Sequence, residues 1–151
     1  MLAGVAHTDE TSRSYLADLH RAAGRSNIQI ATDVAPEHMR KLFNSAGVFW
    51  HAAGYGRSRR HPERAEHFGI ATVEAMAHGC VPVVYGDGGQ PEIVVPGTGL
   101  IWRDTDELLK ATVELYRDPS HRLRLARAAS RSTERFSFDE FHRGCENIFS
   151  H

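Results

Sequence analysis

Short apolar runs, often β-branched, alternate with helical patterns along the whole sequence. Five such runs are predicted to form strands: Leu2–Ala6, Ile28–Thr32, Val48–Ala52, Val81–Tyr85 and Gly99–Arg103. The fourth run, VPVVY, has no polar residue, which is typical of a strand buried on both faces of a sheet. Strands that alternate with helices are joined by right-handed crossovers. The order therefore predicts an α/β fold with a parallel sheet flanked by helices.

The segments between these runs carry apolar residues at helical spacing. They predict helices over Ser14–Ala23, Pro36–Ala46, the segment that leads to Gly79, Pro119–Ser130 and Phe138–Phe149, and also a helix capped by Asp104 or Asp106 that runs to about Tyr116. In the third of these helices, Ile70, Val73 and Ala77 are expected to form a buried stripe, and Gly79 is expected to end the helix. The sequence shows no internal repeat, low-complexity tract or linker. We therefore expect residues 1–151 to form a single domain.

Composition excludes several classes of protein. The 151 residues have a formal net charge of −1 and are 41% hydrophobic, so neither disorder nor a dedicated nucleic-acid binder is expected. No stretch approaches the ~18–20 apolar residues of a membrane span. The first ten residues, MLAGVAHTDE, lack the basic region of a signal peptide. Cys80 and Cys145 provide no disulfide framework, and together these features predict a cytoplasmic protein with reduced thiols.

The connection after the third predicted strand is long and glycine-rich, GYGRSRRHPERA over residues 54–65, and leads into EHFGIATVEAMAHG over residues 66–79. In a parallel sheet, ligands bind in the loops after the strands. Gly69 has no Cβ, so a phosphate could approach the helix N-terminus closely. Glu66 and Glu74 could each accept hydrogen bonds from hydroxyl groups. An alternative is purely structural, with Glu66 interacting with the helix dipole and Glu74 solvated.

A second glycine-rich loop follows the fourth predicted strand. Gly86, Gly88 and Gly89 precede the sequence QPEIV at residues 90–94. Because the carboxyl ends of parallel strands meet at one edge of a sheet, this loop and the loop before Gly69 are expected to face one crevice. Together they predict a ligand with phosphates in the middle and polyols at its ends.

At these residues the sequence resembles a known family. The segments EHFGI and EAMAHG, then VPVV, GGQPEIV and GTGLIW, have the order and spacing found in the C-terminal half of family-4 glycosyltransferases of the GT-B fold. The E-x7-E pair, the FGI step and the GGxPE turn carry this resemblance, which runs from about Leu2 to Phe141. It implies a Rossmann-like sheet, and the HAAGYG run at residues 51–56 is similar to a bacterial mannosyl- or glucosyltransferase branch.

The resemblance also implies an activity and a site. It implies retaining transfer of a hexosyl group from a UDP- or GDP-hexose, without a cofactor or a catalytic metal. Glu66 would be the catalytic residue, binding the transferred sugar, and Glu74 would bind the ribose. The other implied donor-binding residues are His67, Phe68, Gly69, Ile70, Gly54 and Gly89. Catalysis would consist of positioning the donor and stabilising the departing diphosphate.

This sequence departs from the family pattern in three places. His67 stands where the family usually has Gly or Pro. The acceptor-binding N-terminal domain has no counterpart, and neither does the first strand–helix unit of the donor half, whose strand would be central in the sheet. We therefore expect a missing domain or partner chain, and no turnover by the isolated chain. Four arginines of the long loop could replace the lost cations: Arg57, Arg59, Arg60 and Arg64.

Other signals leave alternatives open. The histidines lack zinc-type spacing, so no metal site is expected. A basic stripe on the predicted helix from Pro119 is expected to be a solvated face, with peripheral attraction to anionic lipid as the alternative. Two rival functions remain. One is a sugar-nucleotide epimerase of the GT-B fold, and the other is a non-catalytic binding or assembly module that pairs with a partner chain.

Overall fold

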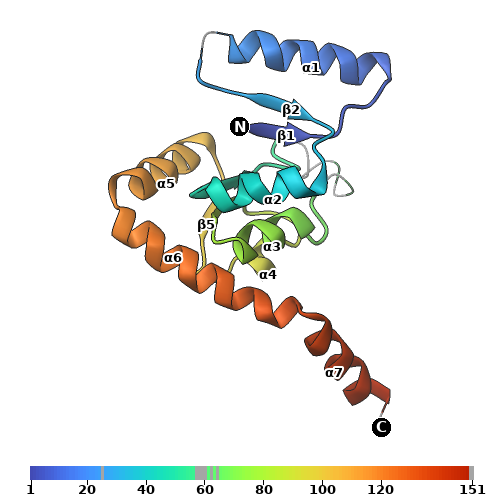
Figure 1. The fold of residues 1–151 in the computed structure, drawn as a ribbon, viewed down its shortest axis with the longest axis vertical. Helices are drawn as coiled ribbons and strands as arrows, with labels where there is room; N and C mark the ends of the chain where they lie inside the picture. The colour runs from blue at the N-terminus through green and yellow to red at the C-terminus, as the bar shows by residue number, and fades with distance from the viewer. Residues whose placement is uncertain (25, 57–60, 62, 64, 150–151) are drawn as a thin grey trace. The chain divides into compact units, whose positions relative to one another are not determined.

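The computed structural model describes the chain except for residues 25, 57–60, 62, 64, 150 and 151. It divides into two compact units, Met1–Lys41 and Leu42–His151. The strands form two parallel sheets, β1-β2 and β3-β4-β5, so the fold class predicted from the sequence is confirmed (Figure 1). Among the described residues, β1 pairs only with β2, and β3 pairs only with β4. The prediction of a single domain stays a prediction.

The first unit consists of β1 (Leu2–Gly4), α1 (Glu10–Ala23), β2 (Ile30–Thr32) and the first residues of α2 (Pro36–Ser45). Helix α1 begins before the predicted Ser14 because the Asp9 side chain accepts a hydrogen bond from the Ser12 N–H at 2.9 Å and caps the helix. Its expected inner face, Leu16, Leu19 and Ala23, is half-buried. No described residue of this unit is fully buried, and a cavity of about 420 Å³ lies between α1 and the two strands.

The second unit contains the larger sheet and most of the helices. Its elements are β3 (Val48–His51), α3 (Ile70–Ala77), β4 (Val81–Tyr85), α4 (Gln90–Ile93), β5 (Leu100–Trp102), α5 (Thr105–Arg117), α6 (Pro119–Ser132), the 3-10 helix η2 (Thr133–Phe136) and α7 (Phe138–Phe149). The bounds of β4 and α7 are those predicted from the sequence. The one-turn helix α4 and η2 were not predicted, since each is too short for a periodic pattern.

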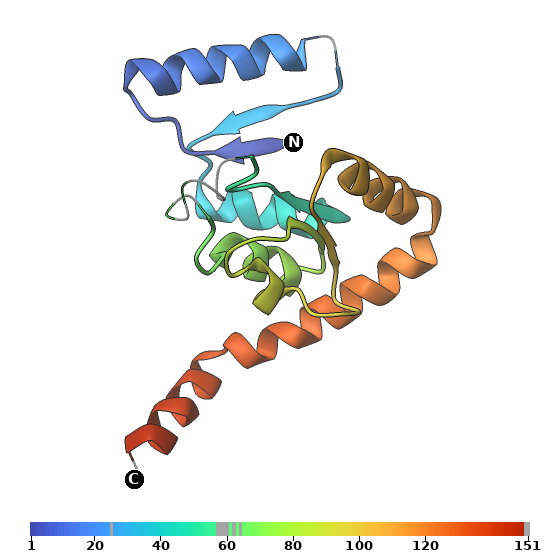
Figure 2. The same ribbon diagram turned by 180° about the vertical axis from the view of Figure 1, so that it is seen from behind.

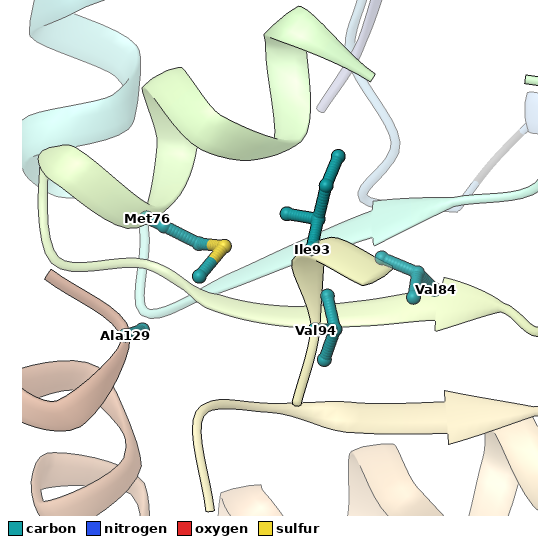
Figure 3. Close-up of a cluster of buried hydrophobic side chains, with 5 residues drawn as sticks. All are labelled: Met76, Val84, Ile93, Val94 and Ala129. Atoms are coloured by element: carbon teal, nitrogen blue, oxygen red, sulfur yellow. The ribbon is translucent and has the colours of Figure 1, made fainter. Parts of the chain in front are cut away.

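Strand β4 is buried on both faces, as its unbroken apolar run predicts. Val81 and Val83 pack with Trp102 of β5 and with residues of α5 and α6. Val84 packs in a second cluster with Met76 of α3, Ile93 of α4, Val94 and Ala129 of α6 (Figure 3). Helices therefore cover both sides of this sheet, and they fix the ends of its strands. Figure 2 shows α6 passing beside the sheet and α7 projecting away from it.

Helix α3 has a different inner face from the one expected. Its buried residues are Thr72, Ala75 and Met76, whereas Ile70 is 66% exposed, Ala77 is exposed and Val73 is half-buried. The predicted stripe is wrong at Ile70 and Ala77, because tertiary packing buries the face that carries Thr72, Ala75 and Met76; only Val73 of the stripe packs against the core. The predicted end of the helix is confirmed, since Gly79 has a φ of +83° just after the last turn.

Candidate functional site

The N-terminus of α3 is formed by Glu66 and Gly69. Gly69 has a left-handed backbone, with a φ of +88°, and is the N-cap residue of the helix. Its N–H donates to Glu66 Oε1 at 3.1 Å. The first N–H groups of a helix have no acceptor within it, so those of the residues just after Gly69 remain able to bind an anion. The Glu66 carboxylate thus lies at the positive end of the helix, as the structural alternative in the sequence also predicts.

A second interaction holds the same carboxylate. The Nε2 atom of His51, the last residue of β3, lies 3.3 Å from Glu66 Oε2. The side chains of His51 and Glu66 are only 13% and 32% exposed. Both carboxylate oxygens therefore have a nitrogen atom nearby, and Glu66 retains only part of its surface for a ligand.

The glycine-rich loop after β4 touches the segment that carries Glu66. The Gly89 N–H donates to the Glu66 carbonyl oxygen at 2.8 Å. A Cβ atom at Gly88 would lie 2.1 Å from this oxygen, and one at Gly89 would lie 2.2 Å from the His67 carbonyl oxygen. Only glycine permits this approach of two backbones. The expectation that the two loops meet at one edge of the sheet is confirmed.

A pocket of about 380 Å³ opens between these loops. It is lined by Ala65, Glu66, His67, Asp87, Gly88, Gly89 and Glu92. Three of these residues are carboxylates, and the described lining contains neither lysine nor arginine. The pocket therefore suits a neutral ligand whose hydroxyl groups donate hydrogen bonds, while an anionic group would be favoured at the amides of α3. The arginines proposed to supply cations, Arg57, Arg59, Arg60 and Arg64, lie outside the described residues.

A buried polar contact fixes α3 against α4. The Thr72 hydroxyl donates to Gln90 Oε1 at 3.1 Å, and Gln90 is buried, with 1% of its surface exposed. A Cβ atom on Gly69 would lie 2.5 Å from Gln90 Nε2, so this amide group lies directly against the N-cap of α3. The contact joins the first turn of α3 to the glycine-rich loop, and a shift of either would disturb the pocket.

The structure places the predicted site residues at different positions around α3. Glu66, His67 and Gly89 line the pocket. Ile70 and Glu74 lie one turn apart on the exposed face of α3. Phe68 is 48% exposed and packs edge-on against Phe136 of η2, with ring centroids 5.6 Å apart. Gly69 is buried, and its N–H bonds the Glu66 carboxylate.

Gly54 does not line this pocket. It lies with Gly56 in a turn after β3, and both have positive φ angles. This turn places the Tyr55 ring 5.3 Å from that of Tyr85 and 5.1 Å from that of Trp102, measured between centroids. The turn is therefore tied to the ends of β4 and β5, and a role of Gly54 in donor binding stays a prediction.

Sequence reasoning missed His51 and Gln90 as parts of the site. The sequence analysis assigns His51 no role beyond its place in the HAAGYG run, although a polar residue at the carboxyl end of a predicted strand is a signal for a site residue. Nothing local distinguishes Gln90, since its contact with Thr72 joins two different elements.

The basic stripe is largely the solvated face that the sequence predicts. Its arginines are Arg122, Arg124, Arg127, Arg131 and Arg135, and all except the half-buried Arg122 are exposed. Two of them also bind backbone: Arg122 donates to the Leu115 carbonyl oxygen at 2.9 Å, and Arg135 donates to those of Glu92 and Ile93. None of the described helices has the length and the apolar character that a membrane-spanning helix requires.

A parallel α/β unit with a glycine-capped helix beside a second glycine-rich loop has the arrangement of a Rossmann-like domain. The chain belongs to the glycosyl transferases group 1 family, which its residues 1–132 match. It is 42% identical over 72 residues to a GDP-mannose-dependent monoacylated α-(1-6)-phosphatidylinositol monomannoside mannosyltransferase of Corynebacterium glutamicum, an alignment that covers 46% of this chain and 19% of the relative.

Solved structures show the same fold. Sucrose-phosphate synthase of Thermosynechococcus elongatus matches with a TM-score of 0.77 at 19% identity, over 99% of this chain and 37% of that protein. HepE of Anabaena in complex with UDP matches with a TM-score of 0.79 at 20% identity, over 99% and 40%. The C-terminal domain of LpcC from Francisella tularensis matches with a TM-score of 0.60 at 20% identity, over 86% and 65%. The chain thus spans about two fifths of the length of the first two.

Proposed function

We propose that this chain is the donor-binding domain of a retaining hexosyltransferase that uses a nucleoside diphosphate hexose. The observation that carries the proposal is the Glu66 carboxylate, held at the N-terminus of α3 and at the wall of a pocket rich in hydrogen-bond acceptors. A diphosphate would bind the helix amides, and the hexose hydroxyl groups would donate to Glu66. Membership of the glycosyl transferases group 1 family supports this assignment.

Glu74 is the second carboxylate of the proposed site. It lies in the second turn of α3, on the same exposed face as Ile70. A ribose attached to a diphosphate at the helix N-terminus would donate its hydroxyl groups to this carboxylate. The transfer itself would depend on placing the donor and on stabilising the diphosphate that leaves.

The relatives support two nucleotide pairs as probes. The C. glutamicum relative is described as GDP-mannose-dependent, and HepE is described in complex with UDP and with UDP-glucose. GDP and GDP-mannose, and UDP and UDP-glucose, are therefore titrated into the 151-residue chain by calorimetry. We expect the chain to bind one of these pairs.

A substitution tests the proposed ribose contact. Glu74→Ala is expected to weaken binding of both members of the preferred pair by roughly tenfold or more, because a hydrogen bond to a charged group contributes about 1.5–3 kcal/mol. Asp106→Ala is the matched control, since it also removes an exposed carboxylate, on α5. Equal affinities for Glu74→Ala and the unsubstituted chain would refute the assignment.

A partner domain is part of the proposal. Strand β3 pairs on one edge only among the described residues, and the apolar residues Phe138, Phe141, Ile148 and Phe149 of α7 are 69–85% exposed. An additional strand and a packing surface from another domain or chain would satisfy both features. We expect no sugar transfer by the 151-residue chain alone; measurable turnover with any of the four nucleotide probes and added acceptors would contradict this.

Three further properties belong to the proposal. The donor site needs no metal, so EDTA should leave nucleotide affinity unchanged. We assign the chain to the cytoplasm, and the free thiols of Cys80 and Cys145 support this. The exposed guanidinium groups of Arg124, Arg127 and Arg131 support peripheral contact with anionic lipid, which co-sedimentation with phosphatidylglycerol vesicles tests.

A further inference from the structure

His51 is placed to control the orientation of Glu66. It is the last residue of β3, paired in register with Val84 of β4, so its backbone position is fixed by the central strand of the sheet. Its ring also lies beside that of Phe49, with centroids 6.3 Å apart. A rigid strand end thus supplies the donor that faces Glu66 Oε2 at 3.3 Å.

The surroundings of the ring indicate which nitrogen carries the proton. His51 Nδ1 is buried and has no hydrogen-bond partner among the described residues. A buried N–H without an acceptor is rarer and costlier than a buried lone pair without a donor. A neutral ring would therefore carry its proton on Nε2, the nitrogen that lies 3.3 Å from Glu66 Oε2.

Glu66 is then held at both oxygens. The Gly69 N–H donates to Oε1, and the His51 ring contacts Oε2 through Nε2 at 3.3 Å. These two groups come from different elements, α3 and β3, so together they fix the plane of the carboxylate at the pocket wall. Without the ring, only the Gly69 N–H would restrain the side chain, and it could rotate about the bonds nearer its Cα.

We propose that His51 is a positioning residue that presents the Glu66 carboxylate to the sugar part of the donor. This inference rests on the proposed function. It predicts different effects on the binding of the nucleotide sugar and of the nucleotide, whereas a general structural role would affect both equally. The nucleoside diphosphate alone does not need Glu66 in its fixed orientation, whereas the hexose does. Loss of His51 should therefore weaken binding of the nucleotide sugar more than binding of the nucleotide.

The test compares affinities within the nucleotide pair that the unsubstituted chain binds more tightly, GDP with GDP-mannose or UDP with UDP-glucose. The measured quantity is the affinity for the sugar nucleotide divided by that for the nucleotide. His51→Phe keeps a ring and removes the donor, and should lower this ratio about tenfold, the effect of losing a hydrogen bond to a charged group. His51→Gln, which can still donate an N–H, should restore most of the ratio.

A second histidine–glutamate pair provides the matched control. His121 Nδ1 lies 2.9 Å from Glu114 Oε1, and neither residue lines the pocket. His121→Phe makes the same chemical change at this pair and should leave the ratio unchanged. An equal fall of the ratio in His121→Phe would overturn the assignment to His51.

The outcomes separate this inference from the proposed function. If the unsubstituted chain binds none of the four nucleotides, the proposed function fails and the role of His51 fails with it. If the chain binds a pair, and Glu74→Ala weakens both members but His51→Phe leaves the ratio unchanged, only the inference is overturned. Should His51→Phe not fold, ¹⁵N NMR of the unsubstituted chain decides: a His51 ring that carries a proton on Nε2 is required, and a ring protonated only at Nδ1 refutes the proposal.

Discussion

Gly89 provides the sharpest test of the contact between the two loops. Its φ is −78° and its ψ is −8°, an ordinary helical backbone that alanine also adopts. Any effect of Gly89→Ala therefore comes from the added methyl group. That group would meet the His67 carbonyl oxygen at 2.2 Å, and no side-chain rotation can relieve a collision with backbone.

The expected cost has two parts. Overpacking typically costs about 1–3 kcal/mol. If the loops separate, the hydrogen bond from the Gly89 N–H to the Glu66 carbonyl oxygen, 2.8 Å long, is lost as well. A typical hydrogen bond contributes about 0.5–1.5 kcal/mol. We therefore expect Gly89→Ala to lower the free energy of unfolding by roughly 1.5–4.5 kcal/mol.

Urea unfolding followed by tryptophan fluorescence measures this change. Trp102 is 2% exposed and belongs to the core cluster of the same unit, so its emission reports unfolding of the sheet that carries the loop. Gly144→Ala is the control, because Gly144 lies within α7 and a Cβ there would meet no atom within 4 Å. The control should be neutral or stabilising, by at most about 1 kcal/mol.

The result that would refute the reasoning is an unfolding midpoint of Gly89→Ala equal to that of the unsubstituted chain at an unchanged urea dependence. The backbones of Gly89 and His67 would then be farther apart than in the structure. The pocket wall that Gly88 and Gly89 form would also have a different position.

Two further predictions concern titratable groups. Burial raises the pKa of the Cys80 thiol, which is 0% exposed and donates to the Phe43 carbonyl oxygen at 3.2 Å; iodoacetamide should therefore modify Cys145 before Cys80, and mass spectrometry that finds Cys80 modified first would contradict this. The backbone N–H of His121 donates to the Asp118 side chain at the start of α6 and lowers the pKa of this carboxyl below its ordinary value of 3.8. The carboxylate of Asp118 therefore stabilises the fold fully when the pH is above the ordinary pKa of this group, and this stabilisation is lost as the pH falls through the lower pKa of the folded state. The stability difference between the unsubstituted chain and Asp118→Asn, measured in urea, should shrink from about pH 5 to about pH 3; a difference that grows would show the opposite sign.

The unbroken run of β4 and the periodicity of α7 give their bounds, because burial on both faces and helical spacing are visible within one segment. The cap at Asp9 is equally local, but apolar spacing alone does not contain it. The inner face of α3 was predicted wrongly, because the choice between Ile70 and Met76 depends on which neighbours pack there.

The sequence by itself determined the alternation of strands and helices, the glycines of both loops and the two glutamates at α3, since short-range propensity and motif spacing encode all of them. Only the tertiary structure decided that His51 faces Glu66, that Thr72 bonds Gln90, and that Gly89 lies against the segment before α3. These partners lie on different elements, and their meeting follows from how β3, β4 and the helices pack. Such contacts form between residues that are distant in the sequence, so local sequence patterns do not predict them.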